Sequence, residues 1–248
     1  MIVIIVASDP EIRFLEKQIS IEERNFHSGV LFLEGFLAGK KVLVVKSGIG
    51  PKKARHAAKQ VLKRGVPDGV VSIGAAGAVD PLLKAGSCIV LKEIIRLSKN
   101  PGEKDKVFSC DEYLSKKVFE CLNQAPFKVV EGIGLTTNLF IHARSEKNRL
   151  FEKYTAQGVD MESAALAEVF SPENIPFADL RIITDPAYCD TVDVNRIYLN
   201  KRKGVMFVLF YFLKNPCELL RAWRLKTEMK RAGYSIARAA EIIVSSLQ

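Results

Sequence analysis

The chain has 248 residues, of which 48% are hydrophobic and 26% charged, and its net charge is +9. This length suits one large α/β domain with a substantial core, and the composition is that of a globular protein. Five scattered cysteines contain no C-x-x-C pair, and the three histidines lie far apart. These spacings indicate neither a disulfide framework nor a metal site, so we expect no metal and no bound cofactor.

The first predicted element is a buried strand over residues 1–7, MIVIIVA. No positively charged segment precedes it, and the apolar run is too short for a signal peptide. We therefore expect a cytoplasmic protein.

Buried strands and helices alternate along most of the chain. A helix is predicted over 51–65, because Pro51 suits its first turn and Gly65 follows its last basic residues. Near-continuous apolar runs predict further strands at 41–48, 69–77, 86–95 and 177–184. This alternation predicts an α/β fold with a mostly buried sheet, formed by one domain over residues 1–195.

The C-terminal segment, 196–248, differs in charge. It contains eleven Lys or Arg and three Glu, so it holds nearly all of the net positive charge of the chain. The basic character is thus a local property, and we do not expect a nucleic-acid-binding protein.

Two apolar elements are predicted in this segment. The run 205–213, VMFVLFYFL, is far short of the roughly 20 residues that a membrane-spanning helix needs. A basic helix follows, with Asn215 as N-cap, Pro216 in the first turn and Gly233 expected to end it. It packs on its own domain or a subunit partner, or else it faces a membrane surface or a lipid-like substrate. Both alternatives stay open.

Two glycine turns follow predicted strands, SGIGPKKA at 47–54 and GAAGAVDPLLKAGS at 74–87. Glycine lets the backbone approach a ligand closely, and free N–H groups bind anions or polar ligand atoms. Neither turn fits a dinucleotide-binding or P-loop motif. Both lie at carboxyl ends of strands, where ligands bind in α/β folds.

Two acids surround a methionine in VDMESAALAEV, 159–169, just before an alanine-rich helix. Acids at a helix start are commonly capping residues. The other interpretation is that one of the two acids, Asp160 or Glu162, holds a ligand.

The order of these motifs, ending with RIITDPA at 181–187, resembles the nucleoside phosphorylase/nucleosidase superfamily over residues 1–190. The narrower resemblance is to hopanoid-associated purine phosphorylases, through Glu-x-Arg at 11–13, SGIGP, VDMES and a basic tail around Asn-Pro. The resemblance implies a single-domain three-layer α/β/α sandwich around a mixed sheet, assembled as a homo-oligomer. It also implies an enzyme that cleaves the N-glycosidic bond of a purine nucleoside.

By resemblance, Asp185 protonates the departing purine at N7. Glu162 accepts hydrogen bonds from the ribose 2′- and 3′-hydroxyls, and Met161 packs against the sugar. The base would lie against Phe140 and Ile141.

The third-strand glycine turn places Ala75 and Gly77 on the substrate side. Glu11 occupies the position of a base that activates water. Its other interpretation is an ordinary acid in a first helical turn.

Two features favour opposite nucleophiles. Arg13, Ser47 and Gly48 favour phosphate, because they supply a cation and donors near a helix start. Ala75 stands where the phosphorylases carry a hydroxyl, which favours water. Phosphorolysis of an adenosine-type nucleoside with a large apolar 5′ group, with phosphate as co-substrate, is our main expectation. A hydrolytic methylthioadenosine/S-adenosylhomocysteine-type nucleosidase is the alternative, and a non-catalytic nucleoside-binding relative is the third.

Overall fold

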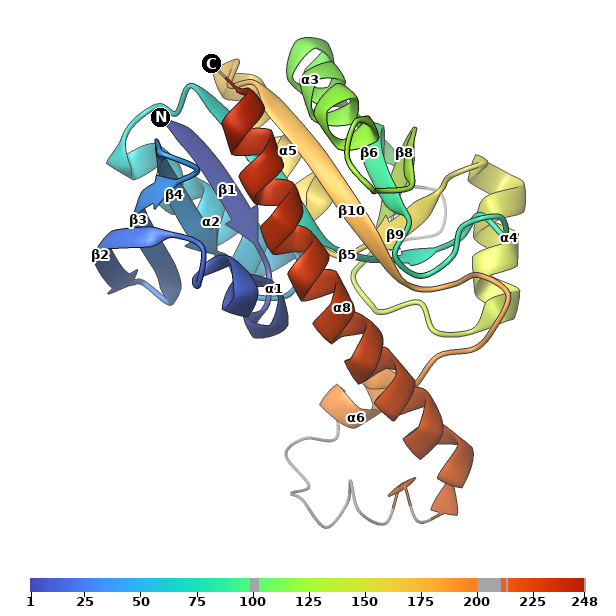
Figure 1. Cartoon of the computed structure of the whole chain (residues 1–248). Coiled ribbons are helices and arrows are strands. Elements are labelled where there is room, and N and C mark those ends of the chain that lie inside the picture. Colours follow the sequence, from blue (N-terminus) through green and yellow to red (C-terminus); the bar gives the residue numbers. More distant parts are fainter. Residues whose placement is uncertain (99–102, 200–210, 213, 248) are drawn as a thin grey trace.

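The computed structural model describes residues 1–98, 103–199, 211–212 and 214–247 (Figure 1). Its strands are β1 (Ile2–Val6), β2 (Ser20–His27), β3 (Val30–Leu37), β4 (Lys40–Lys46), β5 (Gly69–Ala78), β6 (Cys88–Arg96), β7 (Lys106–Ser109), β8 (Val129–Thr136), β9 (Gly158–Asp160) and β10 (Phe177–Asp185). Its helices are α1 (Asp9–Leu15), α2 (Pro51–Arg64), α3 (Glu112–Asn123), α4 (Arg144–Tyr154), α5 (Ser163–Phe170), the 3₁₀ turn η1 (Ser171–Glu173), α6 (Val194–Leu199) and α8 (Pro216–Ser246). The predicted strands and the helix after Pro51 are confirmed.

The strands form one mixed sheet in the order β10-β6-β8-β9-β5-β1-β4-β3-β2, with β7 paired to β6. Parallel pairing joins β4, β1, β5 and β10, whereas β2 and β3 are added antiparallel at one edge. The parallel strands are almost wholly buried because helices cover both faces. The expected α/β class with a mixed sheet is thus confirmed.

The sheet also closes on itself. β10 pairs with β5 in addition to β6, so the pairings β5–β9, β9–β8, β8–β6, β6–β10 and β10–β5 complete a ring. Such closure brings the ends of strands that are distant in sequence to one place. No local pattern in the sequence predicts it.

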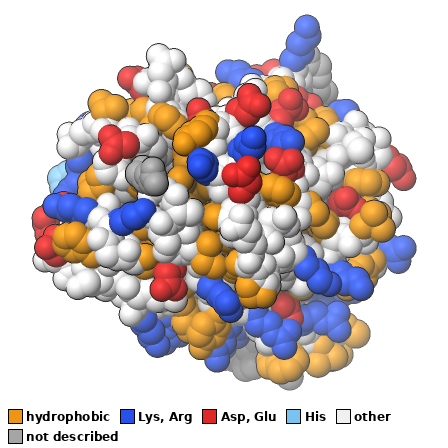
Figure 2. All heavy atoms as spheres, turned by 45° about the horizontal axis from the view of Figure 1, so that its top comes forward, with side chains coloured by type: hydrophobic (Ala, Val, Ile, Leu, Met, Phe, Trp, Pro, Cys, Tyr) orange, Lys and Arg blue, Asp and Glu red, His pale blue; other side chains and the backbone are white. Residues whose placement is uncertain are grey.

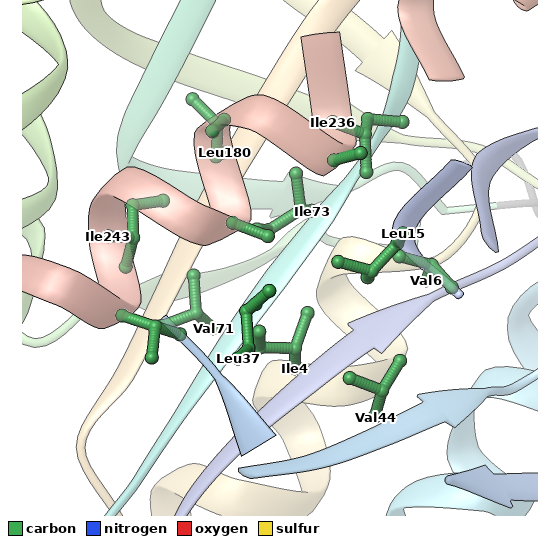
Figure 3. Close-up of a cluster of buried hydrophobic side chains, with 14 of the residues drawn as sticks. Ile4, Val6, Leu15, Leu37, Val44, Val71, Ile73, Leu180, Ile236 and Ile243 are labelled. Carbon is green, nitrogen blue, oxygen red and sulfur yellow. The ribbon is translucent and has the colours of Figure 1, made fainter. Parts of the chain in front are cut away.

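Two hydrophobic layers hold the helices to the sheet. On one face, alanines of α2 and α5 pack closely against β1, β4 and β5. On the other face, α1, α3 and α8 cover the strands. Figure 3 shows Ile236 and Ile243 of α8 over Val71, Ile73 and Leu180 of the sheet.

Helix α8 is longer than expected. It runs without interruption from Pro216 to Ser246, so the prediction that Gly233 ends the helix is wrong. Gly233 is instead buried where α8 crosses α1. A Cβ there would overlap the Pro10 carbonyl oxygen and lie 2.9 Å from Cδ2 of Phe14. The glycine permits the crossing.

The two halves of α8 have different surroundings. Its second half belongs to the core, with Ile236, Ala240 and Ile243 buried. Its first turns extend beyond the sheet beside α6 (Figure 1), and Leu219, Leu220 and Trp223 are exposed there. Figure 2 shows Lys, Arg and hydrophobic side chains gathered along the lower edge, where these turns lie in Figure 1.

The predicted apolar run 205–213 falls outside the described residues, except for Tyr211 and Phe212. Across the described part of the chain, no helix has both the length and the apolar character needed to cross a membrane.

Candidate active site

The closed ring of strands collects the predicted motifs at one end. In the register of β10 and β5, Asp185 lies opposite Gly77, and Gly77 in turn lies opposite Val159 of β9. Thr136 at the end of β8 lies opposite Asp160 at the end of β9. The carboxyl ends of β5, β8, β9 and β10 therefore meet. This is the edge at which α/β sheets bind ligands.

Asp185 is buried, with 4% of its surface exposed. Its Oδ2 accepts a hydrogen bond from Nζ of Lys147 at 2.6 Å, and its Oδ1 accepts one from the Thr184 hydroxyl at 3.1 Å. Burial raises the pKa of Asp185 above its ordinary value, whereas the Lys147 ammonium and the Thr184 hydrogen bond oppose that rise. A carboxyl with a raised pKa in a closed site is suited to donate a proton.

A small cavity is lined by Gly77, the residue that lies opposite Asp185. Gly77, Phe140, Ile141 and Met161 line it, together with Thr137, Leu139, Val159 and Asp160. Four residues predicted to hold the substrate are thus brought together. Its volume is only about 20 Å³, which is room for roughly one water, so the loop around Phe140 has to shift to admit a base.

The loop is held by Asn195 of α6. The Phe140 backbone N–H donates to Oδ1 of Asn195 at 3.0 Å, and Nδ2 of Asn195 donates to the Phe140 carbonyl at 2.7 Å. This paired contact ties 137–143 to the segment after β10. The backbone N–H and carbonyl of Phe140 are therefore both occupied by Asn195 in this conformation.

Glu162 lies at the start of α5, with 6% of its surface exposed. Its Oε1 accepts a hydrogen bond from the backbone N–H of Gly50 at 2.6 Å, which joins the two motifs 159–169 and 47–54. Burial, and next the Asp160 carboxylate, raise the pKa of Glu162 to about 8. Arg181 and the Gly50 hydrogen bond act in the opposite direction.

Asp160 has a structural role. Its Oδ2 accepts hydrogen bonds from the backbone N–H and the hydroxyl of Ser163, and its Oδ1 accepts one from the Thr136 hydroxyl at 2.8 Å. It therefore caps α5 and fastens it to β8. The two carboxylates at this helix start thus have different partners, because Asp160 contacts Ser163 and Thr136 whereas Glu162 contacts Gly50.

Arg181 of β10 is a buried cation beneath these acids. Its guanidinium contacts Asp179 and Asp160 and donates to the hydroxyls of Ser72 and Ser163. Burial disfavours the charge on Arg181, but the two carboxylates raise its pKa, so it remains a cation. The network fixes β5, β9 and β10 relative to one another.

Glu11 is almost fully buried in the first turn of α1. Its Oε2 accepts from the backbone N–H groups of Ala7 and Ser8 at 2.8 and 2.6 Å, and its Oε1 accepts from that of Ala75 at 2.8 Å. Glu11 is therefore both a capping residue of α1 and a link to the glycine turn of β5. A Cβ on Gly74 would lie 3.2 Å from Oε1 of Glu11 and would overlap the Arg181 guanidinium.

The residues expected on the phosphate side are dispersed. Arg13 is exposed and lines a groove between α1 and α8, on the side of α1 away from Ala75. Ser47 is buried, and its hydroxyl donates to the carbonyls of Gly48 and Val6 at 3.1 and 3.4 Å. Gly48 has φ +84°, and a Cβ there would lie 2.7 Å from Cδ of Lys53. The structure thus places Lys53, rather than Arg13, at this turn.

Three residues of the site were missed in the sequence: Lys147, Arg181 and Asn195. Lys147 had a detectable signal, because its spacing to Leu150 and Tyr154 places a lysine on the apolar face of α4. Arg181 had a similar one, as a cation within an apolar strand. Asn195 had none, since its partner Phe140 is distant in the chain.

Comparison with known proteins defines the class. The family model described as "Phosphorylase superfamily" matches residues 1–205. The 5'-methylthioadenosine/S-adenosylhomocysteine nucleosidase of Tolumonas auensis is 30% identical over 83% of this chain and 96% of its own length. That of Bacillus cytotoxicus is 29% identical over 75% and 86%.

Solved structures share the fold. Futalosine hydrolase of Helicobacter pylori superposes with a TM-score of 0.79 at 20% identity, covering 99% of this chain and 97% of the other. The 5'-methylthioadenosine/S-adenosylhomocysteine nucleosidase of Neisseria meningitidis, in complex with methylthio-immucillin-A, gives 0.79 and 20% over 99% of both chains.

The fold and the matching relatives are those of enzymes of nucleoside phosphorylase or nucleosidase type. The chain belongs to the phosphorylase superfamily. The resemblance noted in the sequence is thereby confirmed at the level of the superfamily, while the narrower one to hopanoid-associated purine phosphorylases stays a prediction.

Proposed function

We propose that this protein hydrolyses the N-glycosidic bond of an adenosine-type purine nucleoside. The observation that carries the proposal is the convergence of Glu11, Glu162 and Asp185 at the carboxyl ends of the strands. Relatives that are 28–30% identical are named 5'-methylthioadenosine/S-adenosylhomocysteine nucleosidases, which supports the same substrate class.

Each acid has a role in the proposed reaction. Asp185 donates its proton to N7 of the purine, so that the base departs neutral. Glu162 accepts hydrogen bonds from the ribose hydroxyls and stabilises the positive charge that develops on the sugar. Glu11, oriented by three backbone N–H groups, takes a proton from the attacking water.

Water is favoured over phosphate by the contacts of the glycine turn. The Ala75 N–H, which a phosphate would need as a donor in the absence of a hydroxyl at this position, already donates to Glu11. The Ser47 hydroxyl is engaged with backbone carbonyls, and Arg13 faces the groove.

Phosphorolysis, the main expectation from the sequence, becomes the second candidate. The observation in its favour is the Lys53 side chain against Gly48, which places a cation at the start of α2.

Product analysis separates the two reactions. The purified protein is incubated with adenosine, methylthioadenosine and an adenosine carrying a long apolar 5′ chain, with and without phosphate, and the sugar product is identified. Hydrolysis gives a free ribose product whether or not phosphate is present. Ribose 1-phosphate formed only in the presence of phosphate would show that phosphate, rather than water, is the nucleophile. If no base is released from any of the three nucleosides, nucleoside cleavage is contradicted.

We further propose that a large apolar 5′ group of the substrate occupies the groove between α1 and α8. Its volume is about 1010 Å³, and Ile12, Phe14, Trp223 and Met229 supply apolar lining. Ile12, which lines the groove, directly follows Glu11 in α1, so one helix borders both the groove and the proposed site. Lys46, Lys226 and Lys230 also line the groove. Assembly of identical subunits and contact with a membrane surface stay predictions.

A further inference from the structure

Lys147 of α4 is the feature of the site that the proposed reaction does not yet use. Its side chain is completely buried, and its Nζ lies 2.6 Å from Oδ2 of Asp185 and 3.1 Å from the carbonyl oxygen of Pro186. Burying an ammonium group is costly, and a buried ion pair often gives no more stability than an apolar pair of the same size. A requirement of stability alone therefore does not explain why α4 directs a lysine at this carboxyl.

The groups around Asp185 come from three elements. Lys147 approaches from α4, the Thr184 hydroxyl from β10 itself, and Gly77 from β5. A Cβ on Gly77 would lie 2.9 Å from Oδ2 and 3.3 Å from Oδ1, so both oxygens reach the space that the missing side chain leaves open. Gly77 also lines the cavity with Phe140 and Met161. The carboxyl thus lies between the Lys147 ammonium and Gly77, and Gly77 is the residue that it shares with the predicted base pocket.

We propose that Lys147 is a positioning residue that acts through Asp185, by stabilising the carboxylate that Asp185 becomes after it has given its proton to the purine. The inference rests on the proposed function, in which Asp185 is the proton donor. The proton of the Asp185 carboxyl moves to N7 and the C1′–N9 bond breaks with its electron pair going to the base. The resulting carboxylate stays paired with the Lys147 ammonium, which keeps its own protons throughout.

Without the ion pair with Lys147, the Asp185 carboxylate would be much less stable than the protonated carboxyl. A carboxylate formed at a site with 4% exposure has little water to solvate it, so its formation would be strongly opposed. An ammonium at 2.6 Å offsets that opposition at the moment when the charge appears. The pairing therefore favours departure of the base, and it also fixes the direction of the carboxyl through Oδ2.

Two substrates separate this role from a structural one. Adenosine needs a proton on its leaving group, whereas 4-nitrophenyl β-D-ribofuranoside releases a stable anion and needs none. Lys147→Met and Lys147→Gln are compared with Lys153→Met, which removes an exposed lysine from the same helix. We expect Lys147→Met to lower kcat/KM for adenosine at least about tenfold more than for the nitrophenyl riboside. Lys147→Gln, which keeps a hydrogen-bond donor without the charge, should behave similarly, and Lys153→Met should match the wild type.

The pH profile gives a second readout. Without the ammonium, the pKa of Asp185 rises further, so the basic limb of kcat/KM for adenosine moves to higher pH in the folded Lys147 variants. An equal loss on both substrates, or no loss on either, would overturn the proposal. If the wild type releases no base from any nucleoside, the proposed function fails by itself. In that case the pKa of Asp185 is measured by ¹³C titration of its carboxyl, whose signal is assigned with Asp185→Asn. An Asp185 pKa that is the same in Lys147→Gln as in the wild type contradicts the proposed action of Lys147 on Asp185.

Discussion

Asp185 and Gly77 face each other across the β10–β5 pairing, so closely that a methyl group on Gly77 would lie 2.9 Å from Oδ2 of Asp185. The glycine is therefore required by the position of the carboxyl rather than by a turn. The same glycine lines the cavity predicted to receive the base. The proposed proton donor and the predicted base pocket thus meet at one residue that has no side chain.

The substitution Gly77→Ala tests this relationship. The added methyl displaces the carboxyl or narrows the cavity, and a misplacement of about 1 Å costs on the order of 10²-fold in rate. We expect kcat/KM for adenosine to fall by about that factor, while the circular dichroism spectrum stays that of the wild type. Wild-type kinetics from a folded variant would show that the carboxyl acts elsewhere.

Asp185→Asn should remove the proton donor while keeping the shape of the side chain. We expect kcat for adenosine to fall by about 10²–10⁴-fold. The matched control is Asp68→Asn, since Asp68 lies on the surface. Full activity of Asp185→Asn would remove this residue from the mechanism.

The raised pKa of Glu162 predicts how the stability of the protein depends on pH. Its pKa is raised to about 8 in the folded protein from an ordinary 4.5, mainly by burial. Between these values the native state holds a proton that the unfolded chain releases, so the contribution of this group to stability falls as pH rises through that window. Glu162→Gln cannot ionise. We expect its thermal unfolding midpoint, relative to the wild type, to be higher at pH 8.5 than at pH 5.

If the difference in unfolding midpoint between Glu162→Gln and the wild type does not change with pH, the raised pKa of Glu162 is contradicted. Activity gives a cross-check, because the ribose hydroxyls require a carboxylate as acceptor. The affinity of the wild type for adenosine should therefore rise with pH toward the pKa of Glu162.

Gly233→Ala tests the crossing of α8 and α1. In an exposed helix interior this change would stabilise by about 1 kcal/mol. Here the methyl would overlap the Pro10 carbonyl and press on Phe14. We expect a net loss of about 1–3 kcal/mol in the free energy of unfolding, measured by denaturant titration. Arg238→Ala, an exposed change on the same helix, should be close to neutral. If Gly233→Ala is more stable than the wild type, α1 shifts to make room for the methyl group at little cost in free energy.

The groove between α1 and α8 can be tested with two neighbouring side chains. Trp223 and Leu220 are both 69% exposed, but only Trp223 lines the groove. Trp223→Ala should raise KM for the adenosine with a long apolar 5′ chain several-fold and leave adenosine itself unchanged, because the buried apolar area is lost only for the former. Leu220→Ala is the control. Equal effects of both variants, or an effect on adenosine, would argue against the groove as the 5′ site.

Local sequence patterns predicted several central strands of the sheet and helix α2. The apolar runs around Ile4, Val44, Val71 and Ile182 are strands, and Pro51 starts α2 as expected. Of the strands that were missed, β3 is a clear apolar run, whereas others have weak patterns. β9 has only three residues, and β2 is exposed at nearly every position. The prediction that Gly233 ends the helix was wrong because a glycine is a common helix-stop signal. The contact with Pro10 that requires a glycine here cannot be read from the sequence.

The candidate site could be proposed from the sequence where its residues lie in a motif. Glu11, Glu162 and Asp185 each stood out in a short stretch with a resemblance behind it. Their partners did not, since Gly50 reaches Glu162 across 112 residues and Lys147 reaches Asp185 across 38. Such contacts depend on how strands order themselves in the sheet, which no single segment encodes.

The closed ring of strands also sets an order of assembly. β10 spans Phe177–Asp185 and fills the position between β5 and β6, so a chain that ends before it leaves two unpaired strand edges exposed. Because β10 also brings Arg181 and Asp185, the charged network and the proposed proton donor are completed together with the last strand. A chain that ends before β10 therefore lacks both Arg181 and Asp185, and pairing between strands so far apart in sequence makes this closure a slow step of folding.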